Sequence, residues 1–238
     1  MFNWLVIGWL VISGLVHGKL SVLKYQSTNH QPPTTNHQPP INHYNMADLN
    51  KLKEIKLQLA KQRVQLVAVS KTKPIKAILE LYHAGHRTFG ENRVQELVEK
   101  YEQMPKDIKW HFIGHLQSKK VKYIAPFVDL VHAVDSSQLL QEINKQAAKN
   151  KRTIDCLLQM HIAEESSKYG FDESEIMELM QNTDLAALQN IRIVGMMGMA
   201  TYTNDAHQIK REFLQLRNTF EVLKQQFFEG QAHFKELS

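Results

Sequence analysis

From Met46 onward the chain alternates short apolar runs with longer amphipathic runs, and this alternation limits its possible folds more than any other feature. Apolar runs of this length are typical of strands buried on both faces, and the runs between them have the spacing of helices that cover a sheet. The order predicts an α/β fold with a parallel sheet, either doubly wound or closed as a barrel. Strands are expected at 66–69, 87–90, 110–113, 130–134, 155–162 and 193–199.

The helices between these strands can be placed by their end signals. The first is expected to begin after Asp48, a residue type that caps helix N-termini. A second is expected to open at Pro74 and stop at Gly85, the ends at which proline and glycine are most common. Further helices are expected at 94–104, 118–127, 137–149, 172–182 and 205–228.

The first 45 residues differ from the rest in composition. An uncharged apolar run at 2–16 is followed by the repeat TNHQPP at 28–33 and 35–40. We expect 1–45 to be a leader and linker, disordered or lying before the true start, and 46–238 to be one domain. The alternative is a working export signal or anchor. No metal is expected on the histidines of the repeat, since nothing there fixes their geometry.

Charge and cysteine content exclude several classes of function. The chain carries a net charge of +5, but Lys19 and Lys24 lie in the first segment, which has no acid, so 46–238 carries only +3. This is too little to indicate nucleic-acid binding. The single cysteine, Cys156, excludes disulfides and a redox pair and favours a reducing compartment.

Polar residues follow most of the predicted strands, at the edge where ligands bind in parallel α/β folds. Lys71 follows the first strand, where burial and the neighbouring Lys73 are expected to lower its pKa. A lysine that is partly neutral near pH 7 can form an imine with an aldehyde such as pyridoxal phosphate. The alternative is a lysine whose head group simply reaches solvent.

The other candidates have structural interpretations. HExxH, CxxC, GxSxG, Walker and GxGxxG motifs are all missing from the sequence. Glu91 and Asn92 are interpreted as N-terminal caps of the following helix, and Gly195 and Gly198 as sites of close packing. Three methionines are interpreted as filler of the barrel interior: Met196, Met197 and Met199. Three histidines have no visible partner and are interpreted as packing residues: His111, His115 and His132.

Five segments of the chain resemble, in the same order, segments of the pyridoxal phosphate homeostasis protein family. They are AVSKTKP (68–74), FGENRVQE (89–96), WHFIGHLQSKK (110–120), SSKYGF (166–171) and GMMGMA (195–200). The resemblance runs from about Met46 to Ser238. It implies a TIM-type (β/α)8 barrel like the N-terminal domain of alanine racemase. It also implies pyridoxal 5'-phosphate held as an imine on Lys71, and a role in intracellular cofactor and vitamin B6 homeostasis without established catalysis.

The site expected from this resemblance has no metal ligand and no catalytic residue. Lys168 is a second amine that could receive the aldehyde during delivery to an acceptor, and the alternative is an ordinary surface lysine. We expect the cofactor-binding residues to be Lys71, Asn92, His111, Ser166, Lys168 and Met197.

The chain departs from the family at both ends. The family lacks a segment like 1–45, and it continues past Ser238, so the barrel is expected to be truncated before its last two strands. We therefore expect exposed sheet edges and weakened retention of the cofactor. The alternatives are a racemase-like enzyme, although there is no room for a second base from a further domain, and an inactive fragment.

Location and partners follow from the same resemblance. We expect a cytoplasmic protein that is a monomer when complete and binds a small-molecule cofactor. Cofactor-free pyridoxal phosphate enzymes are its expected acceptors, and no nucleic acid is expected. A membrane is expected only if the leader functions.

Overall fold

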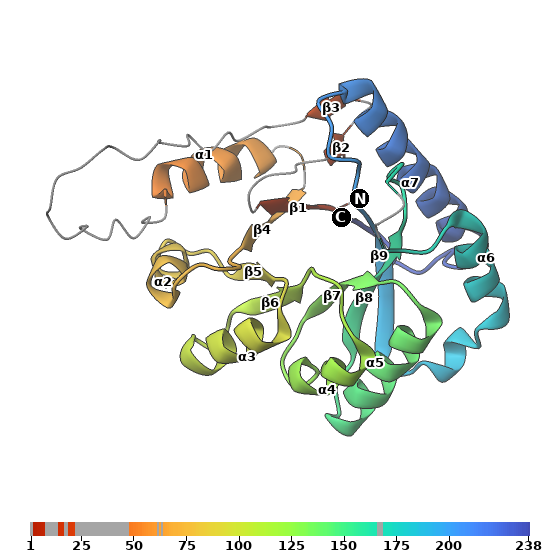
Figure 1. Ribbon diagram of the computed structural model, residues 1–238, viewed down its shortest axis with the longest axis horizontal. Coiled ribbons are helices and arrows are strands. Elements are labelled where there is room, and N and C mark those ends of the chain that lie inside the picture. Colours follow the sequence, from red (N-terminus) through yellow and green to blue (C-terminus); the bar gives the residue numbers. More distant parts are fainter. Residues whose placement is uncertain are drawn as a thin grey trace, which may run out of the picture.

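The computed structural model (Figure 1) describes residues 2–7, 14–16, 19–21, 48–60, 62, 64–165 and 169–238, and the first three of these ranges are described by their backbone alone. In chain order the elements are β1 Phe2–Ile7, β2 Gly14–Val16, β3 Lys19–Ser21, α1 Leu49–Ala60, β4 Val64–Val69, α2 Ile75–His83, β5 Thr88–Glu91, α3 Val94–Gln103, β6 Lys109–Phe112, the 3-10 helix η1 Ser118–Lys120, α4 Val121–Ile124, β7 Leu130–Val134, α5 Ser137–Lys149, β8 Ile154–Met160, α6 Glu173–Asn182, the 3-10 helix η2 Leu185–Ala187, β9 Ile191–Gly198, α7 Ala206–Gln226 and β10 Glu236–Leu237.

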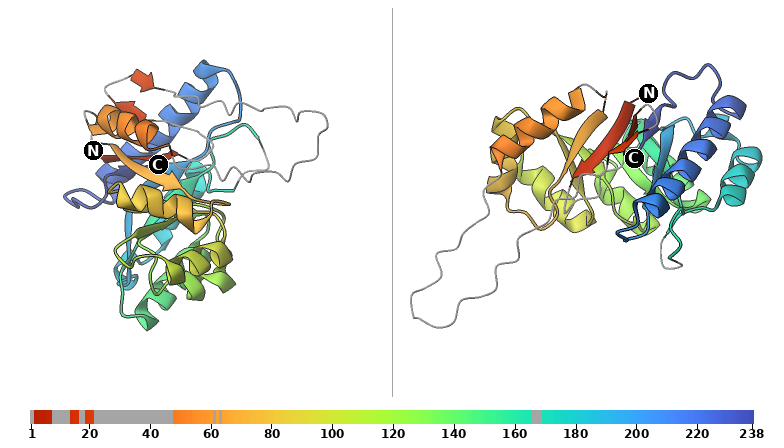
Figure 2. Two further views of the ribbon diagram at one scale, coloured as in Figure 1. Left: turned by 90° about the vertical axis from the view of Figure 1, so that its left-hand side faces the viewer. Right: turned by 90° about the horizontal axis from the view of Figure 1, so that it is seen from above.

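The strands form a closed parallel barrel in the order β1-β10-β9-β8-β7-β6-β5-β4. Figure 1 shows the helices α1 to α7 arranged around these strands, and Figure 2 shows the same layers from two other sides. Strand–helix units in chain order with strands paired to their neighbours are the pattern of a TIM-type barrel. The predicted α/β fold is confirmed, and of the two predicted architectures the barrel is the one observed.

Most elements lie where the sequence predicts them. The predicted strand at 130–134 and helix at 137–149 match β7 and α5 to the residue. The predicted helix at 118–127 is instead a 3-10 turn followed by α4, which ends at Ile124. Ala125 still has helical angles (φ −53°, ψ −31°), but Pro126 has no N–H and cannot donate the next helical hydrogen bond, so the helix ends here.

The barrel edges differ from the expectation. β1 pairs in parallel with β4, where Leu5 is opposite Leu66, and with β10, where Phe2 is opposite Glu236. The prediction of two exposed sheet edges is therefore wrong in this structure, because β1 lies between them. The division of the chain at residue 45 stays a prediction.

Apolar side chains pack in separate layers on the two faces of the barrel wall. The largest cluster lies between strands and helices and includes the buried Phe89, Trp110 and Phe112. A smaller cluster on the opposite face of β7, β8 and β9 fills the barrel interior, as side chains do in eight-stranded barrels. Its members are Leu130, Ala133, Leu157, Val194 and Met197.

The methionines and glycines of the GMMGM segment fit their predicted packing roles, with one exception. Met196 and Met197 are buried, but Met199 is 44% exposed, so its assignment as filler is wrong. Gly195 has φ +157°, and a Cβ there would lie 1.8 Å from the Glu236 carbonyl oxygen. At Gly198 a Cβ would lie 2.7 Å from Ile162 Cδ1. Close packing of β9 against the β10 backbone therefore requires Gly195, whereas at Gly198 a Cβ would meet the end of the Ile162 side chain rather than backbone.

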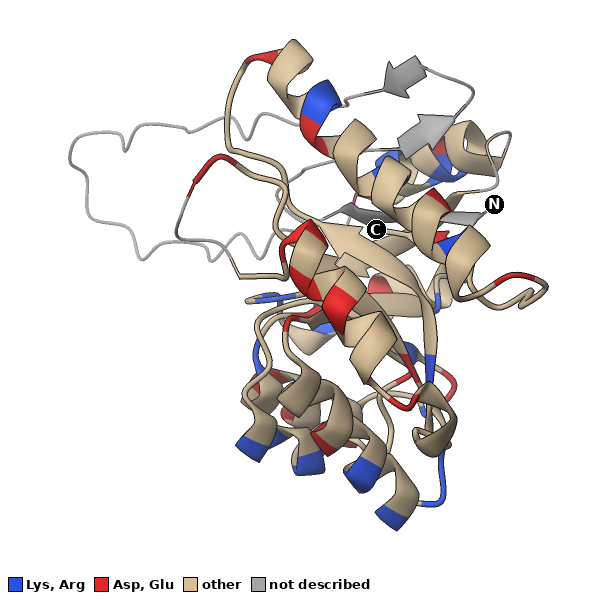
Figure 3. Cartoon of the chain, turned by 90° about the vertical axis from the view of Figure 1, so that its right-hand side faces the viewer, with Lys and Arg blue, Asp and Glu red and all other residues tan. Residues whose placement is uncertain are grey.

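Charges are unevenly distributed on the surface. Helix α6 carries three glutamates and no basic residue, and it stands out as the red helix in the centre of Figure 3. Within the described ranges, none of the helices combines the length and apolar character needed to cross a membrane. The same ranges hold no cluster of three or more His, Cys, Asp or Glu side chains placed to bind a metal ion.

Candidate functional site

Lys71 stands two residues beyond the end of β4, at the carboxyl edge of the barrel. Leu66 packs against α1, while Val67 lies against the position where Gly90 would carry a side chain, so the two residues face opposite sides of the wall. Side chains alternate along a strand, so Val69 shares the inward face with Val67, and Lys71 follows them in the turn directly after the strand. The side chain is half-buried. A primary amine therefore lies at the barrel mouth.

Asn92 directly follows the neighbouring strand, β5. The register pairs Val69 with Gly90, which puts Asn92 at the level of Lys71. Its backbone is pressed against Gly114, where a Cβ would lie 2.5 Å from the Asn92 carbonyl oxygen. Its side-chain Oδ1 is buried and has no hydrogen-bond partner among the described residues. A buried amide oxygen of this kind is an acceptor available to a ligand.

His111 lies one step deeper, inside the barrel, and is buried together with His132. The Nδ1 atom of His111 is 3.0 Å from the Nε2 atom of His132, whose Nδ1 is 2.9 Å from the Ser238 hydroxyl oxygen. Burial lowers the pKa of His132 to about 3 and, together with the charges of His132 and Lys109, holds the pKa of His111 well below its usual range. The pair is neutral at pH 7. These histidines pack as predicted, but each has a polar partner that the sequence does not reveal.

His115 connects three loops at the mouth. Its Nδ1 atom is 2.8 Å from Asp135 Oδ2, and its ring stacks on Tyr169 with centroids 4.0 Å apart. These residues follow β6, β7 and β8, respectively. The packing interpretation of His115 is wrong, because its side chain is exposed and hydrogen-bonded.

The region beneath the Lys71 loop holds a buried charged cluster that we name the Lys100 cluster: Ser70, Glu91, Glu96 and Lys100. The interpretation of Glu91 and Asn92 as helix caps is wrong, because α3 has Arg93 at its cap position with no side-chain capping bond. Glu91 instead accepts hydrogen bonds from Ser70 Oγ and Lys100 Nζ, both at 2.6 Å.

Burial and hydrogen bonding act in opposite directions on the two carboxylates of the cluster. Burial raises the pKa of Glu91, although its hydrogen bonds from Lys100 and Ser70 act against this shift. Burial also acts to raise the pKa of Glu96, but hydrogen bonds from Lys100 and the Thr72 N–H outweigh it and leave the pKa lowered. The spacing of Glu96 and Lys100, four residues apart on α3, is the signal from which this pair could have been predicted.

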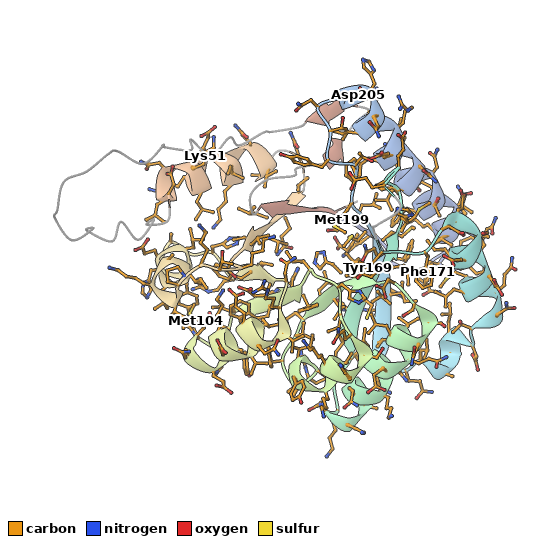
Figure 4. The ribbon with its side chains drawn as sticks, in the orientation of Figure 1. Lys51, Met104, Tyr169, Phe171, Met199 and Asp205 are labelled. Atoms are coloured by element: carbon orange, nitrogen blue, oxygen red, sulfur yellow. The ribbon has the colours of Figure 1, made fainter. Side chains whose placement is uncertain are left out.

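The opposite side of the mouth is formed by the loops after β8 and β9. Figure 4 shows Tyr169 and Met199, which come from these two loops, near the centre of the molecule. The loops are joined by hydrogen bonds from the Glu164 N–H to Thr201 Oγ1 at 3.0 Å and from the Tyr202 N–H to Glu165 Oε1 at 3.1 Å. The predicted site residues Ser166 and Lys168 lie outside the described residues.

The structure thus brings only part of the predicted set together. Lys71 and Asn92 lie at the same level on adjacent strand ends. His111 lies deeper on the next strand, and Met197 lies in the barrel interior on β9, separated from His111 by β7 and β8. In the part of the chain that the structure describes, the mouth holds the Lys71 amine and the unpartnered Asn92 amide oxygen above a neutral, closely packed interior.

Comparisons with known proteins agree with this geometry. The family model of the alanine racemase N-terminal domain matches residues 47–235. A pyridoxal phosphate homeostasis protein of Aquifex aeolicus is 36% identical over 164 residues, covering 68% of this chain and 71% of the relative. A protein of the same name from Vibrio alginolyticus is 37% identical over 171 residues, covering 70% of this chain and 72% of the relative.

A solved structure also resembles the chain closely. PipY of Synechococcus elongatus, solved with pyridoxal phosphate bound, has a TM-score of 0.70 at 34% identity, covering 79% of this chain and 86% of PipY. The structure of PipY without the cofactor has a TM-score of 0.73 over the same shares. The likeness includes both the fold and the sequence.

Proposed function

Because the chain belongs to the pyridoxal phosphate homeostasis protein family, which is built on the alanine racemase N-terminal domain, we propose that it binds pyridoxal 5'-phosphate at the carboxyl end of its barrel. The cofactor is held as an imine on Lys71 and serves pyridoxal phosphate homeostasis. The observation that carries this proposal is the half-buried amine of Lys71 at the barrel mouth, in a chain 34% identical to a protein solved with this cofactor.

The residues around Lys71 fit the aldehyde end of the cofactor. A primary amine is the group that adds to an aldehyde to form an imine. The unpartnered Oδ1 of Asn92 at the same level supplies an acceptor for a donor on the ligand. His111 and Met197 belong to the proposed site as the floor beneath it, since both are buried in the barrel below the mouth. Ser166 and Lys168 stay predictions.

The proposed role is storage and delivery of the cofactor. The relatives named above carry the name of homeostasis proteins rather than of enzymes, which supports a role without catalysis. Cofactor-free pyridoxal phosphate enzymes are the proposed acceptors. We also propose a cytoplasmic location, supported by the presence of a single cysteine, Cys156, which is buried and unpaired.

The test is a titration of the full chain with pyridoxal phosphate, followed by its visible absorbance before and after dialysis. Lys71→Ala should abolish the absorbance of the imine, and Lys73→Ala, which removes a lysine from the same loop, should retain it. The proposal is wrong if Lys71→Ala binds and absorbs as the unchanged chain does. Dialysis also tests the prediction of weakened retention.

A further inference from the structure

We propose that Lys100 is a positioning residue for the cofactor-binding amine. Its buried ammonium group ties together the two peptide groups that flank Lys71, and this fixes where Lys71 stands at the barrel mouth. The inference rests on the proposed function for the role of Lys71, while the contacts described next are independent of any ligand.

The first contact holds the residue before Lys71. Lys100 Nζ donates hydrogen bonds to the Ser70 carbonyl oxygen at 2.6 Å, to Glu91 Oε1 at 2.6 Å and to Glu96 Oε1 at 2.7 Å. An ammonium group has three donors, and all three are used here. The side chain is only 6% exposed, so water does not compete for these bonds. The ammonium group is therefore held in one orientation, with the Ser70 carbonyl as one of its three fixed points.

The second contact holds the residue after Lys71. The Thr72 N–H donates to Glu96 Oε1 at 2.5 Å, the same oxygen that accepts from Lys100. Thr72 has φ 61°, a left-handed conformation that is rare and costly for a β-branched residue. Such a conformation persists only where the surroundings hold it. Two bonds supply this restraint: Glu96, itself fixed by Lys100, accepts from the Thr72 N–H, and the Ser70 carbonyl oxygen accepts from the Lys73 N–H at 3.0 Å across the turn.

The tie is anchored in the barrel wall. The Ser70 N–H donates to the Gly90 carbonyl oxygen at 3.0 Å, and Ser70 Oγ donates to Glu91 Oε1 at 2.6 Å. Glu91 is the last residue of β5 and is completely buried. The Lys71 loop is thus fixed to the strand and the helix of the next unit, so Lys71 has a defined position before any ligand arrives. Preorganisation of this kind is how a scaffold gains reactivity at one chosen group.

A purely structural role of Lys100 makes a different prediction. If Lys100 only neutralised Glu91 and Glu96 under α3, its removal would lower stability and leave the reactivity of Lys71 unchanged in the folded protein. A positioning role requires that the reactivity of Lys71 change even where the fold is kept. The two can be separated in a variant that removes the Lys100 bonds without leaving a charged Glu91 buried alone.

The experiment compares Glu91→Gln/Lys100→Met, which removes both charges, with Lys100→Arg and with Lys145→Met, which removes an exposed lysine from α5. Circular dichroism first establishes that each full-length variant is folded. Two quantities are then measured: the apparent affinity for pyridoxal phosphate, and the pH profile of reductive methylation of Lys71 by formaldehyde, read by peptide mass mapping. The second measurement needs no cofactor.

We expect the affinity of the double variant to fall about tenfold or more, because a hydrogen bond to a charged group is worth about this much in an equilibrium constant. The methylation profile of Lys71 should shift, Lys100→Arg should recover part of the loss, and Lys145→Met should match the unchanged chain. The inference would be overturned by a folded double variant whose affinity for pyridoxal phosphate, and whose methylation of Lys71 at each pH, both stay within about twofold of those of the unchanged chain.

Two further outcomes are decisive. If the double variant does not fold, Glu96→Gln replaces it. This variant keeps Lys100 and Glu91 but weakens the hydrogen bond that holds Thr72. An unchanged methylation profile of Lys71 in this variant overturns the inference. If the unchanged chain forms no imine at Lys71 while the variants still shift the methylation profile, the proposed function fails and the positioning role stands.

Discussion

The two sides of the barrel mouth are held in different ways. On the side of β4 and β5, the Lys71 loop is tied by the Lys100 cluster, whose glutamate Glu91 is completely buried. On the side of β8 and β9, the loops are joined by hydrogen bonds from the exposed Glu164 and Tyr202 to the half-buried Thr201 and Glu165, and Tyr202 is 93% exposed. Buried ionic bonds are costly to break, whereas water readily replaces exposed ones. We call the side of β4 and β5, which presents the Lys71 amine, the fixed side. We call the side of β8 and β9, whose hydrogen bonds water can replace, the replaceable side.

The largest effect is expected from Lys100→Ala on the fixed side. This change leaves the buried carboxylate of Glu91 without its cation, and breaking a buried pair costs about 3–5 kcal/mol of unfolding free energy. Chemical denaturation measures the loss, with Lys122→Ala, an exposed lysine of α4, as the control. A loss of less than about 1 kcal/mol would put the cluster in the class of exposed pairs and remove the contrast between the two sides.

The buried pair His111 and His132, which lies below both sides of the mouth, should make the stability of the protein sensitive to acid. The folded chain keeps His132 neutral down to about pH 3, whereas the unfolded chain binds a proton near the ordinary pKa of 6.5. Stability is therefore full above pH 6.5 and falls as the pH drops from 6.5 toward 3, by about 2 kcal/mol at pH 5 for this histidine alone. The melting temperature at pH 7.5 and pH 5 measures the fall.

His132→Gln is the matched variant for this pH dependence. It removes one titrating group and should reduce the slope between pH 6.5 and 5 by that group's share, while His111 and His86, whose pKa values burial also lowers, keep the rest. A wild-type melting temperature that stays constant over this range would contradict the assignment of a neutral buried pair.

A smaller effect is expected from Glu212→Gln on the side of β8 and β9, where Glu212 is buried as Glu91 is but accepts its hydrogen bonds from the neutral Thr201 and Gln208. Glu212 Oε2 accepts from the Thr201 N–H at 2.7 Å, and its Oε1 accepts from Thr201 Oγ at 2.6 Å. An amide keeps only one acceptor, so the unfolding free energy should fall by about 1–2 kcal/mol. The affinity of the chain for pyridoxal phosphate should change less than in the Lys100 variants. A larger effect on affinity than theirs would reverse the assignment of the two sides.

The smallest effect is expected from Arg211→Ala. Arg211 Nη2 is 3.9 Å from Glu164 Oε1, and both side chains are exposed. Pairs of this kind contribute about 0.5 kcal/mol or less. Unfolding in denaturant should match that of the unchanged chain within this amount, and a larger loss would show that the β8 and β9 loops are held more firmly than their exposure indicates.

The sequence predicts the fold better than it predicts the site, and the reason is physical. Elements such as β7 and α5 follow from local periodicity, which needs no knowledge of distant residues. The bonds of the site are long-range: Lys100 meets Ser70 across 30 residues, and His111 meets His132 across 21. Pattern alone therefore assigned Glu91 to a helix cap, although the tertiary structure places it beneath the Lys71 loop.

Resemblance and geometry contribute different parts of the account. The motif around Lys71 indicates which amine to examine, and the barrel places it at the mouth beside Asn92. Neither the motif nor the spacing shows that Thr72 is held at φ 61° by Glu96. That feature appears only in the folded structure, and it distinguishes Lys71 from Lys73, the other lysine of its loop.

The most direct test of the account is to trap the bound cofactor where it forms its bond. The full chain is incubated with pyridoxal 5'-phosphate, reduced with borohydride, digested and mapped by mass spectrometry. The account predicts a label confined to Lys71. A label spread over exposed lysines, or confined to a lysine other than Lys71, would contradict it.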